Sequence, residues 1–168
     1  MRIDDSDLPT RNSILDMLRT ICPEGDLALD PDGTVRVRSA QVCTEEFYQA
    51  HRSCRCICHI IMLDRTVTIR INAARAAVGK GGMTVDANAD DTANGTGSDE
   101  TVFVDNRNLF PQPDWIILAH ELCGHALPGM RGNHPEWRPG RPGFTPDWHK
   151  RAIEAENEVR REHGLPPR

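Results

Sequence analysis

The residues best suited to chemistry stand together in one short segment, His120-Glu121-Leu122-Cys123-Gly124-His125. Imidazoles are common zinc ligands, and a glutamate beside them can take a proton from the attacking water. Histidines four residues apart share one face of an α-helix, but the spacing here is five, which separates them by roughly 140°. We therefore predict a one-residue π-bulge, placed at Gly124, that returns His125 to the face of His120.

A catalytic zinc ion takes three protein ligands and keeps one position open. On the last predicted helix, a helical wheel places Glu156 at the flank of the apolar stripe, beside His149 and Arg160. Glu156 is the predicted third ligand, and Arg160, four residues on, is a partner that would fix its orientation. Other residues remain open as the third ligand: Glu154, Glu158 and His134.

The elements that must position these residues follow from periodicity, caps and turns. Helices are expected at 13–20, from the N-cap Thr44 to about Ser53, at 114–126, and from Pro146 to about Glu162. Pro128 and Gly129 would end the third of these helices. Strands are expected at 34–38, after a turn at 30–33, and at 101–104, and a hairpin joins 54–63 to 66–72. Residues 79–100 are predicted to form a long polar loop. The expected fold is a small α+β domain, residues 1–168, with a short antiparallel sheet.

Composition excludes several classes of function. The chain has 168 residues, with 20 basic and 25 acidic side chains and a net charge of -5, and no basic stripe stands out. We therefore expect no nucleic-acid partner. The longest apolar run is only a handful of residues, so no membrane span is expected. The first residues lack an apolar stretch behind a basic start, so we expect no secretory signal.

The cysteines are numerous for a domain without a signal peptide: Cys22, Cys43, Cys54, Cys56, Cys58 and Cys123. On the predicted strand, Cys54, Cys56 and Cys58 would share one face. Structural disulfides and free thiols are both open at this point. A second metal site built on these three and His59 is disfavoured, because no second ligand pair is evident elsewhere in the chain.

The metal segment resembles the H-E-L-L-G-H helix of dipeptidyl peptidase III, which has the same five-residue spacing and a glutamate zinc ligand on a later helix. A broader likeness covers Gly95 to Arg168 and is to the bacterial effector metallopeptidases, the zinc domains of type III effectors and of VgrG-type type VI secretion effectors. It rests on Gly95-Thr-Gly97-Ser98-Asp99, on Leu118-Ala119-His120-Glu121-Leu122, and on the ending from Glu156-Asn157 to Gly164-Leu-Pro166-Pro-Arg168. Those effectors have four-residue spacing in the metal helix, so this chain departs from them there.

The resemblance implies a zincin-like domain in which His120, His125 and Glu156 hold Zn²⁺ and Glu121 is the general base. It implies that an edge strand beside the metal helix binds substrate, for which Thr101, Val102, Phe103 and Val104 are the candidates. The donor that stabilises the oxyanion is sought among three residues, His134, His149 and Tyr48. For His149, a plain core or surface role competes with that one.

The implied biology is an effector toxin delivered by a specialised secretion system without a signal peptide. Its substrate would be a periplasmic protein or a cell-wall peptide in a neighbouring bacterium, and a cognate immunity protein would be a further partner. Delivery into the oxidising periplasm would allow disulfides to form. Two alternatives stay open: a protease directed at a host cell, acting in the host cytosol, and a zinc-stabilised binding module without catalysis.

Overall fold

The elements around residues 120–125 are drawn from the whole length of the chain. The computed structural model describes residues 1–5, 7–39, 42–78, 81–105, 107, 110–132 and 146–168. It is a mixed α+β structure. In chain order the elements are β1 (Arg2–Ile3), α1 (Leu8–Ile21), η1 (Pro23–Gly25), β2 (Leu27–Leu29), β3 (Val35–Val37), α2 (Glu45–Ala50), α3 (Arg52–Met62), β4 (Val67–Ile71), α4 (Ala73–Val78), β5 (Gly82–Asp86), α5 (Ala89–Ala93), β6 (Glu100–Val104), α6 (Asp114–Ala119), η2 (His120–Ala126), α7 (Leu127–Met130) and α8 (Pro146–Glu162).

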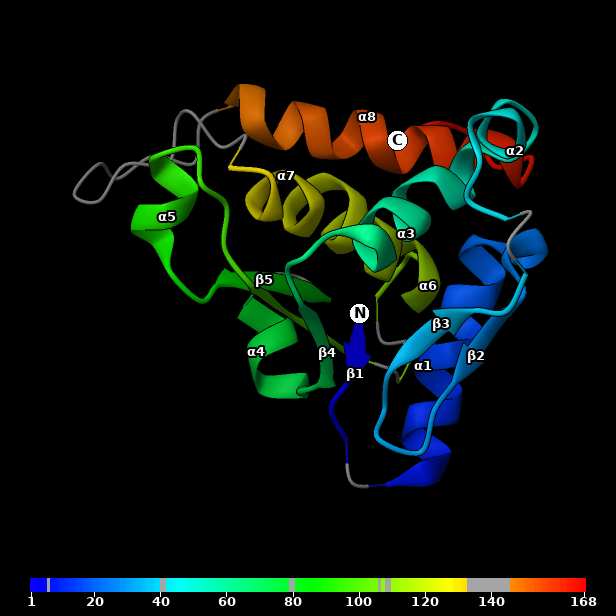
Figure 1. Cartoon of the computed structure of the whole chain (residues 1–168). Helices are drawn as coiled ribbons and strands as arrows, with labels where there is room; N and C mark the ends of the chain where they lie inside the picture. The colour runs from blue at the N-terminus through cyan, green and yellow to red at the C-terminus, as the bar shows by residue number, and fades with distance from the viewer. Residues whose placement is uncertain (6, 40–41, 79–80, 106, 108–109, 133–145) are drawn as a thin grey trace.

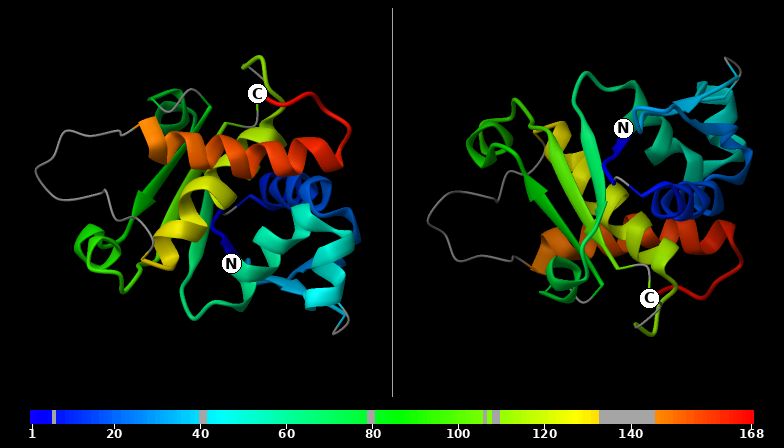
Figure 2. Two further views of the ribbon diagram at one scale, coloured as in Figure 1. Left: turned by 90° about the horizontal axis from the view of Figure 1, so that it is seen from above. Right: turned by 90° about the horizontal axis from the view of Figure 1, so that it is seen from below.

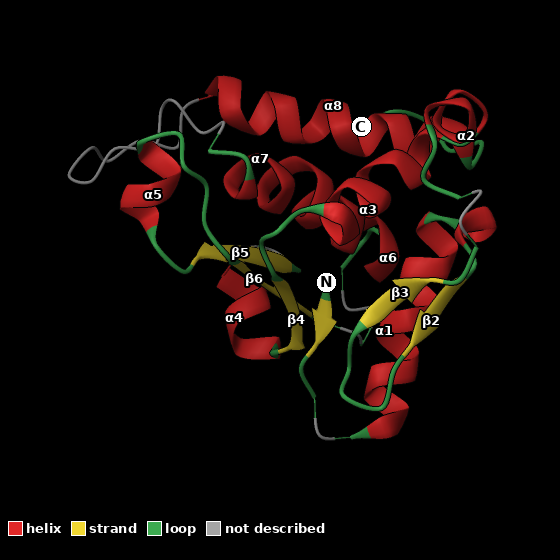
Figure 3. Cartoon of the chain, in the orientation of Figure 1, coloured by secondary structure: helices red, strands yellow, loops and turns green. Residues whose placement is uncertain are grey.

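Four short strands form a mixed sheet in the order β1-β4-β6-β5 (Figure 3). β1, β4 and β6 run parallel, and β5 runs antiparallel to β6, with Asp86 opposite Glu100. Val67 and Ile69 on β4 and Val102 and Val104 on β6 are buried, which follows the two-residue period of a strand. β2 and β3 form a separate antiparallel pair across the predicted turn.

The continuous helix made of α6, η2 and α7 lies between the four-stranded sheet and α8 (Figure 1). η2 packs on β5 and β6 on one side and on α8 on the other, and α8 crosses it at an angle (Figure 2). Ile116, Leu118 and Leu122 are fully buried in this middle layer. The segment that carries the chemistry is therefore held by the core. In the part of the chain that is described, no helix combines the length and apolar character needed to cross a membrane.

The predicted helix at 13–20 is confirmed and is longer, as α1. Asp7 begins it by accepting a hydrogen bond from the Thr10 amide, and Pro9 stands in its first turn. Thr44 caps α2 as predicted, by accepting from the Phe47 amide, but α2 ends at Ala50. The predicted helix at 114–126 continues to Met130. Pro128 does not end it and stands in the first turn of α7, directly after η2.

The predicted hairpin of 54–63 and 66–72 is wrong in its first half. Residues 52–62 form the helix α3, and only β4 is a strand. The alternation of cysteines suggested a strand, but the buried residues Cys54, Ile57 and Cys58 repeat at three and four positions, which is the period of a helix face. A short apolar run fits both periods, so its packing decided the outcome.

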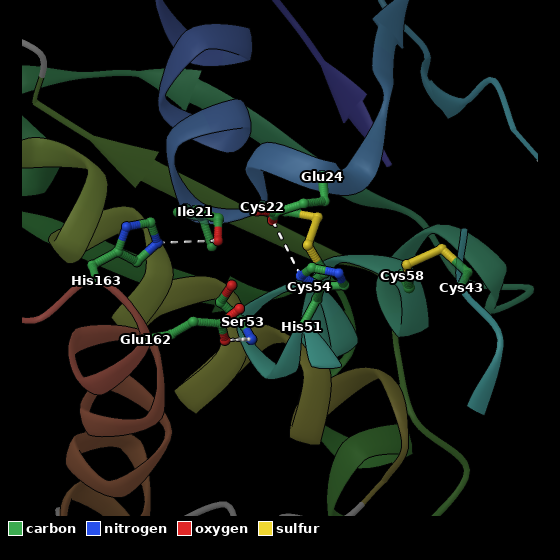
Figure 4. Close-up of a disulfide and its surroundings, with 10 residues drawn as sticks. All are labelled: Ile21, Cys22, Glu24, Cys43, His51, Ser53, Cys54, Cys58, Glu162 and His163. Atoms are coloured by element: carbon green, nitrogen blue, oxygen red, sulfur yellow. Dashed lines mark hydrogen bonds and ion pairs between the residues drawn. A yellow bond between two sulfur atoms is a disulfide. The ribbon is translucent and has the colours of Figure 1, made fainter. Parts of the chain in front are cut away.

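The six cysteines form three disulfides, each with one partner on α3: Cys22–Cys54, Cys43–Cys58 and Cys56–Cys123. At about 100° per residue, Cys54 and Cys58 lie roughly 40° apart on the helix and Cys56 points to the opposite side. The first two bonds therefore tie α3 to the N-terminal part of the chain (Figure 4), and the third ties it to η2. Of the two alternatives left open by the sequence, structural disulfides and free thiols, the structure has disulfides.

The predicted polar loop at 79–100 contains two elements, β5 and α5. β5 pairs along its whole length with β6, and Asn88 caps α5 by accepting from the Asp90 amide. The alternation of Met83 and Val85 was too short to predict a strand within a segment rich in Gly, Asp and Asn. Pairing with β6 therefore supplied what the local sequence does not.

Candidate metal centre

The segment from His120 to Ala126 is a π-helix set between two α-helical segments. All of its residues are buried. The wider turn absorbs the extra residue, so His120 and His125 point the same way, with 3.1 Å between their Nε2 atoms. The bulge predicted from the five-residue spacing is confirmed.

Gly124 is also required because α8 lies so close to it that no side chain fits between them. A Cβ atom on Gly124 would lie 2.5 Å from the Cβ of Ala152 and 2.6 Å from its Cα. No side chain fits at such distances, since the main chain of Ala152 itself is in the way. The glycine therefore sets how closely α8 lies against the histidine segment.

α8 brings His149 to the two histidines of η2. Its ring centroid lies 5.3 Å from that of His120 and 6.4 Å from that of His125. One nitrogen from each of the three rings can be chosen so that all lie within 4.8 Å of one another. His149 was predicted as a candidate transition-state donor or as a plain core or surface histidine, and in the structure it completes the cluster.

Glu156, the predicted third ligand, lies behind His120 and is not among these nitrogens. Its Oε2 is 3.0 Å from the Nδ1 of His120, the nitrogen on the far side of the ring from Nε2. Arg160 Nε donates to Oε1 at 2.6 Å, and Arg168 Nη1 donates to Oε2 at 3.2 Å. The predicted pairing of Glu156 with Arg160 is confirmed. The wheel identified the correct helix face. His149 and Glu156 lie only about 20° apart on that face, so the wheel could not tell which of them joins the two histidines.

The electrostatics of Glu156 suit an anion that orients an imidazole. Its burial opposes ionisation, but hydrogen bonds from His120 and Arg160, and the charges of both, outweigh that cost and lower its pKa to about 2. A carboxylate on one ring nitrogen fixes the tautomer so that the other nitrogen presents its lone pair. Glu156 therefore directs His120 Nε2 toward His125.

The three imidazoles fit a zinc ion. Zinc–nitrogen bonds of about 2.0–2.1 Å in a tetrahedral arrangement place two ligand nitrogens roughly 3.3 Å apart. The observed separation of 3.1 Å between His120 and His125 is close to this value. Three imidazole nitrogens with a carboxylate behind one of them form a donor set typical of zinc.

Glu121 points from η2 toward β5. Its Oε2 accepts a hydrogen bond of 2.7 Å from the Thr84 hydroxyl, and the side chain is buried. Gly82 makes room for it, because a Cβ there would lie 2.6 Å from the Glu121 Cγ. Burial raises the pKa of Glu121, while the Thr84 hydrogen bond and the nearby His120 act against that rise. A carboxylate with a raised pKa is better suited to accept a proton near neutrality.

The predicted substrate-binding strand, Thr101–Val104, is not at an edge. It belongs to β6, which lies between β4 and β5. β5 is the strand at that end of the sheet, and it was hidden in the predicted loop. Sequence reasoning therefore missed Gly82 and Thr84, for which the Met83–Val85 alternation was the only signal.

The remaining predicted residues lie elsewhere. Tyr48 packs edge-on against His59, with 5.2 Å between ring centroids, and so belongs to the contact between α2 and α3. His134 lies outside the described residues. A second group of possible metal ligands, Glu24, His51 and Glu162, surrounds the Cys22–Cys54 bond. These side chains have structural contacts: Glu24 pairs with His51 at 3.5 Å, and Glu162 accepts from the Ser53 amide at 2.6 Å (Figure 4).

No protein-family model, curated protein or solved structure matches this chain.

Proposed function

We propose that this protein is a zinc-dependent peptidase. The observation that carries the proposal is a cluster of three histidines together with a buried glutamate, Glu121, that lies near enough to His120 for the two to interact electrostatically. A structural zinc site has four protein ligands and no need of a base. A catalytic site has three ligands, an open position and a general base. Three histidines together with a buried glutamate support the second pattern.

The roles follow from the contacts. His120, His125 and His149 would hold the ion, with Glu156 orienting His120. Bound zinc would polarise the substrate carbonyl and make water more acidic. Glu121, held by Thr84, takes a proton from the attacking water and delivers it to the nitrogen of the leaving amine. The proton removed from the nucleophile is thereby returned to the departing group.

The substrate would be an extended peptide that lies along β5. In the described part of the chain, β5 is hydrogen-bonded to β6 on one side only. Its other side can accept a peptide backbone by adding a strand. Thr84 on this strand already contacts Glu121, so a peptide on β5 would pass beside the base.

The proposed setting is a secreted antibacterial effector that works in the periplasm of another bacterium, on a protein or a cell-wall peptide, and is countered by an immunity protein. Three disulfides support an oxidising compartment, because such bonds do not persist in a reducing cytosol. A host-directed protease is the alternative. Expression in a Gram-negative bacterial host with and without an added periplasmic signal separates the two: an antibacterial effector is toxic only in the periplasm.

The decisive experiment combines metal analysis with hydrolysis of an unstructured protein such as casein. Wild type should retain one zinc per chain and cut the substrate. Glu121→Gln should keep the zinc and lose hydrolysis, whereas His149→Ala should lose both. Full hydrolysis by Glu121→Gln contradicts the mechanism. A zinc site with four protein ligands in X-ray absorption spectra would instead identify a non-catalytic binding module.

A further inference from the structure

A cavity of about 210 Å³ lies beside the Cys56–Cys123 disulfide. Its walls come from α3, from η2 and α7, and from α8. Both cysteines line it, so the disulfide is reached from this cavity. Cys56 is half-buried, whereas Cys123 is only 8% exposed. A small molecule in the cavity would therefore meet the sulfur of Cys56 first.

The cavity is positively charged. Three arginines line it, Arg52, Arg55 and Arg131, against one carboxylate, that of Glu158. Arg131 Nη2 lies 2.8 Å from the Nδ1 of His59. Burial and the arginine charges lower the pKa of His59, so this ring accepts the hydrogen bond and adds no charge. The excess of guanidinium groups favours an anionic ligand.

The disulfide is coupled to the metal centre by its position. Cys123 stands between His120 and His125 in the π-helical segment. Its partner Cys56 lies on α3, which the other two disulfides fasten to the N-terminal part of the chain. A π-helix is an uncommon conformation that competes with the α-helix. If the segment returned to α-helical geometry, His120 and His125 would separate by roughly 140° and could not share an ion.

We propose that the Cys56–Cys123 disulfide is a redox control site for the metal centre, opened by an anionic low-molecular-weight thiol that binds in the arginine-lined cavity. This inference rests on the proposed zinc-peptidase function. In the oxidised protein the disulfide holds the π-helical segment against α3 and keeps the histidines together. Reduction releases the segment and weakens metal binding. The enzyme is then inactive in a reducing cytosol and becomes active in an oxidising compartment.

The reaction balances with two thiols. The first, as a thiolate, attacks the Cys56 sulfur, and Cys123 leaves as a thiolate that takes up a proton. A second thiolate attacks the external sulfur of this mixed disulfide and releases Cys56, which is protonated in turn. Cys56 and Cys123 gain two electrons and two protons, and the two external thiols become one disulfide. The guanidinium groups favour the anionic attacking form.

The first test compares zinc affinity, measured by competition with a chelator, in three oxidised proteins. The Cys56→Ser/Cys123→Ser variant should bind zinc at least about tenfold more weakly than wild type. The matched control, Cys43→Ser/Cys58→Ser, removes a disulfide that does not touch η2 and should stay within about threefold of wild type. Equal affinity of all three proteins, or equal weakening of both variants, overturns the inference.

A second measurement avoids reliance on the folding of the variants. Wild-type protein loaded with zinc is treated with reduced glutathione or with neutral 2-mercaptoethanol, and zinc release and disulfide opening are followed together, the latter by mass mapping. Zinc release should follow the opening of Cys56–Cys123. In wild type, anionic glutathione should open the bond faster than neutral 2-mercaptoethanol. This difference in rate should disappear in Arg55→Gln/Arg131→Gln. Zinc retained after that bond opens, or an unchanged ratio of rates, overturns the inference. Oxidised wild type that binds no zinc would overturn the proposed function itself.

Discussion

Gly124 and Ala152 are in main-chain contact, at the point where α8 crosses the π-helical segment. The position of a Cβ on Gly124 lies 2.6 Å from the Ala152 Cα and 3.2 Å from its carbonyl oxygen. Ala152 lies between His149 and Glu156 on α8, so the same contact sets the distance of both side chains from His120. The geometry of the metal centre therefore depends on a residue that binds no metal.

Gly124→Ala should weaken zinc binding by about tenfold or more, because α8 must move away and take His149 with it. Overpacking of this kind should also lower stability by about 1–3 kcal/mol. Chelator competition and urea unfolding measure the two effects. Leu122→Met, a volume-conserving change in the same segment, is the control. Unchanged zinc affinity in Gly124→Ala would contradict the role given to this contact.

Glu156→Gln should keep the fold but bind zinc about 10–100-fold more weakly, since the amide no longer orients His120 as a carboxylate does. His149→Ala should bind more weakly still, because a ligand is lost. Glu154→Gln, an exposed change on the same helix, is the control for both. If Glu156→Gln were the weaker binder of the two, the assignment of Glu156 behind His120 would be wrong.

Thr84→Val should retain zinc and lower hydrolysis by about tenfold or more, because Glu121 loses the hydroxyl that positions it. That hydrogen bond lowers the pKa of Glu121. Its removal should therefore move the acidic limb of the pH–rate profile of kcat/KM to higher pH. Thr84→Ser preserves the hydroxyl and should resemble wild type. An acidic limb that does not move would argue against Glu121 as the base.

The buried Glu100 should make the protein less stable as the pH rises. Burial and the adjacent Asp86 raise its pKa from 4.5 to about 9. Between these values the folded protein holds a proton that the unfolded chain releases, so the free energy of unfolding falls with increasing pH. Below both values this group contributes no pH dependence.

Glu100→Gln removes this proton uptake. Its melting temperature relative to wild type should rise from about pH 5 to about pH 9, by roughly 2–4 °C for each kcal/mol of differential stability. Glu46→Gln, at an exposed position, is the control and should show no such trend. A constant difference between Glu100→Gln and wild type would mean that Glu100 is ionised in the folded state.

The sequence alone determined what depends on spacing along one element. The five-residue interval between His120 and His125 required a π-bulge, and the structure has a π-helix there. The four-residue interval between Glu156 and Arg160 places the two side chains within reach of each other, and they are hydrogen-bonded as predicted. Such relations follow from helix geometry, which is the same in every protein.

The tertiary structure decided what depends on how elements meet. The Cys54–Cys58 run fits a strand or a helix equally well until its three disulfide partners are known, and β5 becomes a strand only against β6. The placement of His149 beside His120 and His125, with Glu156 behind His120, depends on how closely α8 approaches Gly124. Distances between elements arise from packing of side chains that are far apart in sequence, and no local pattern encodes them.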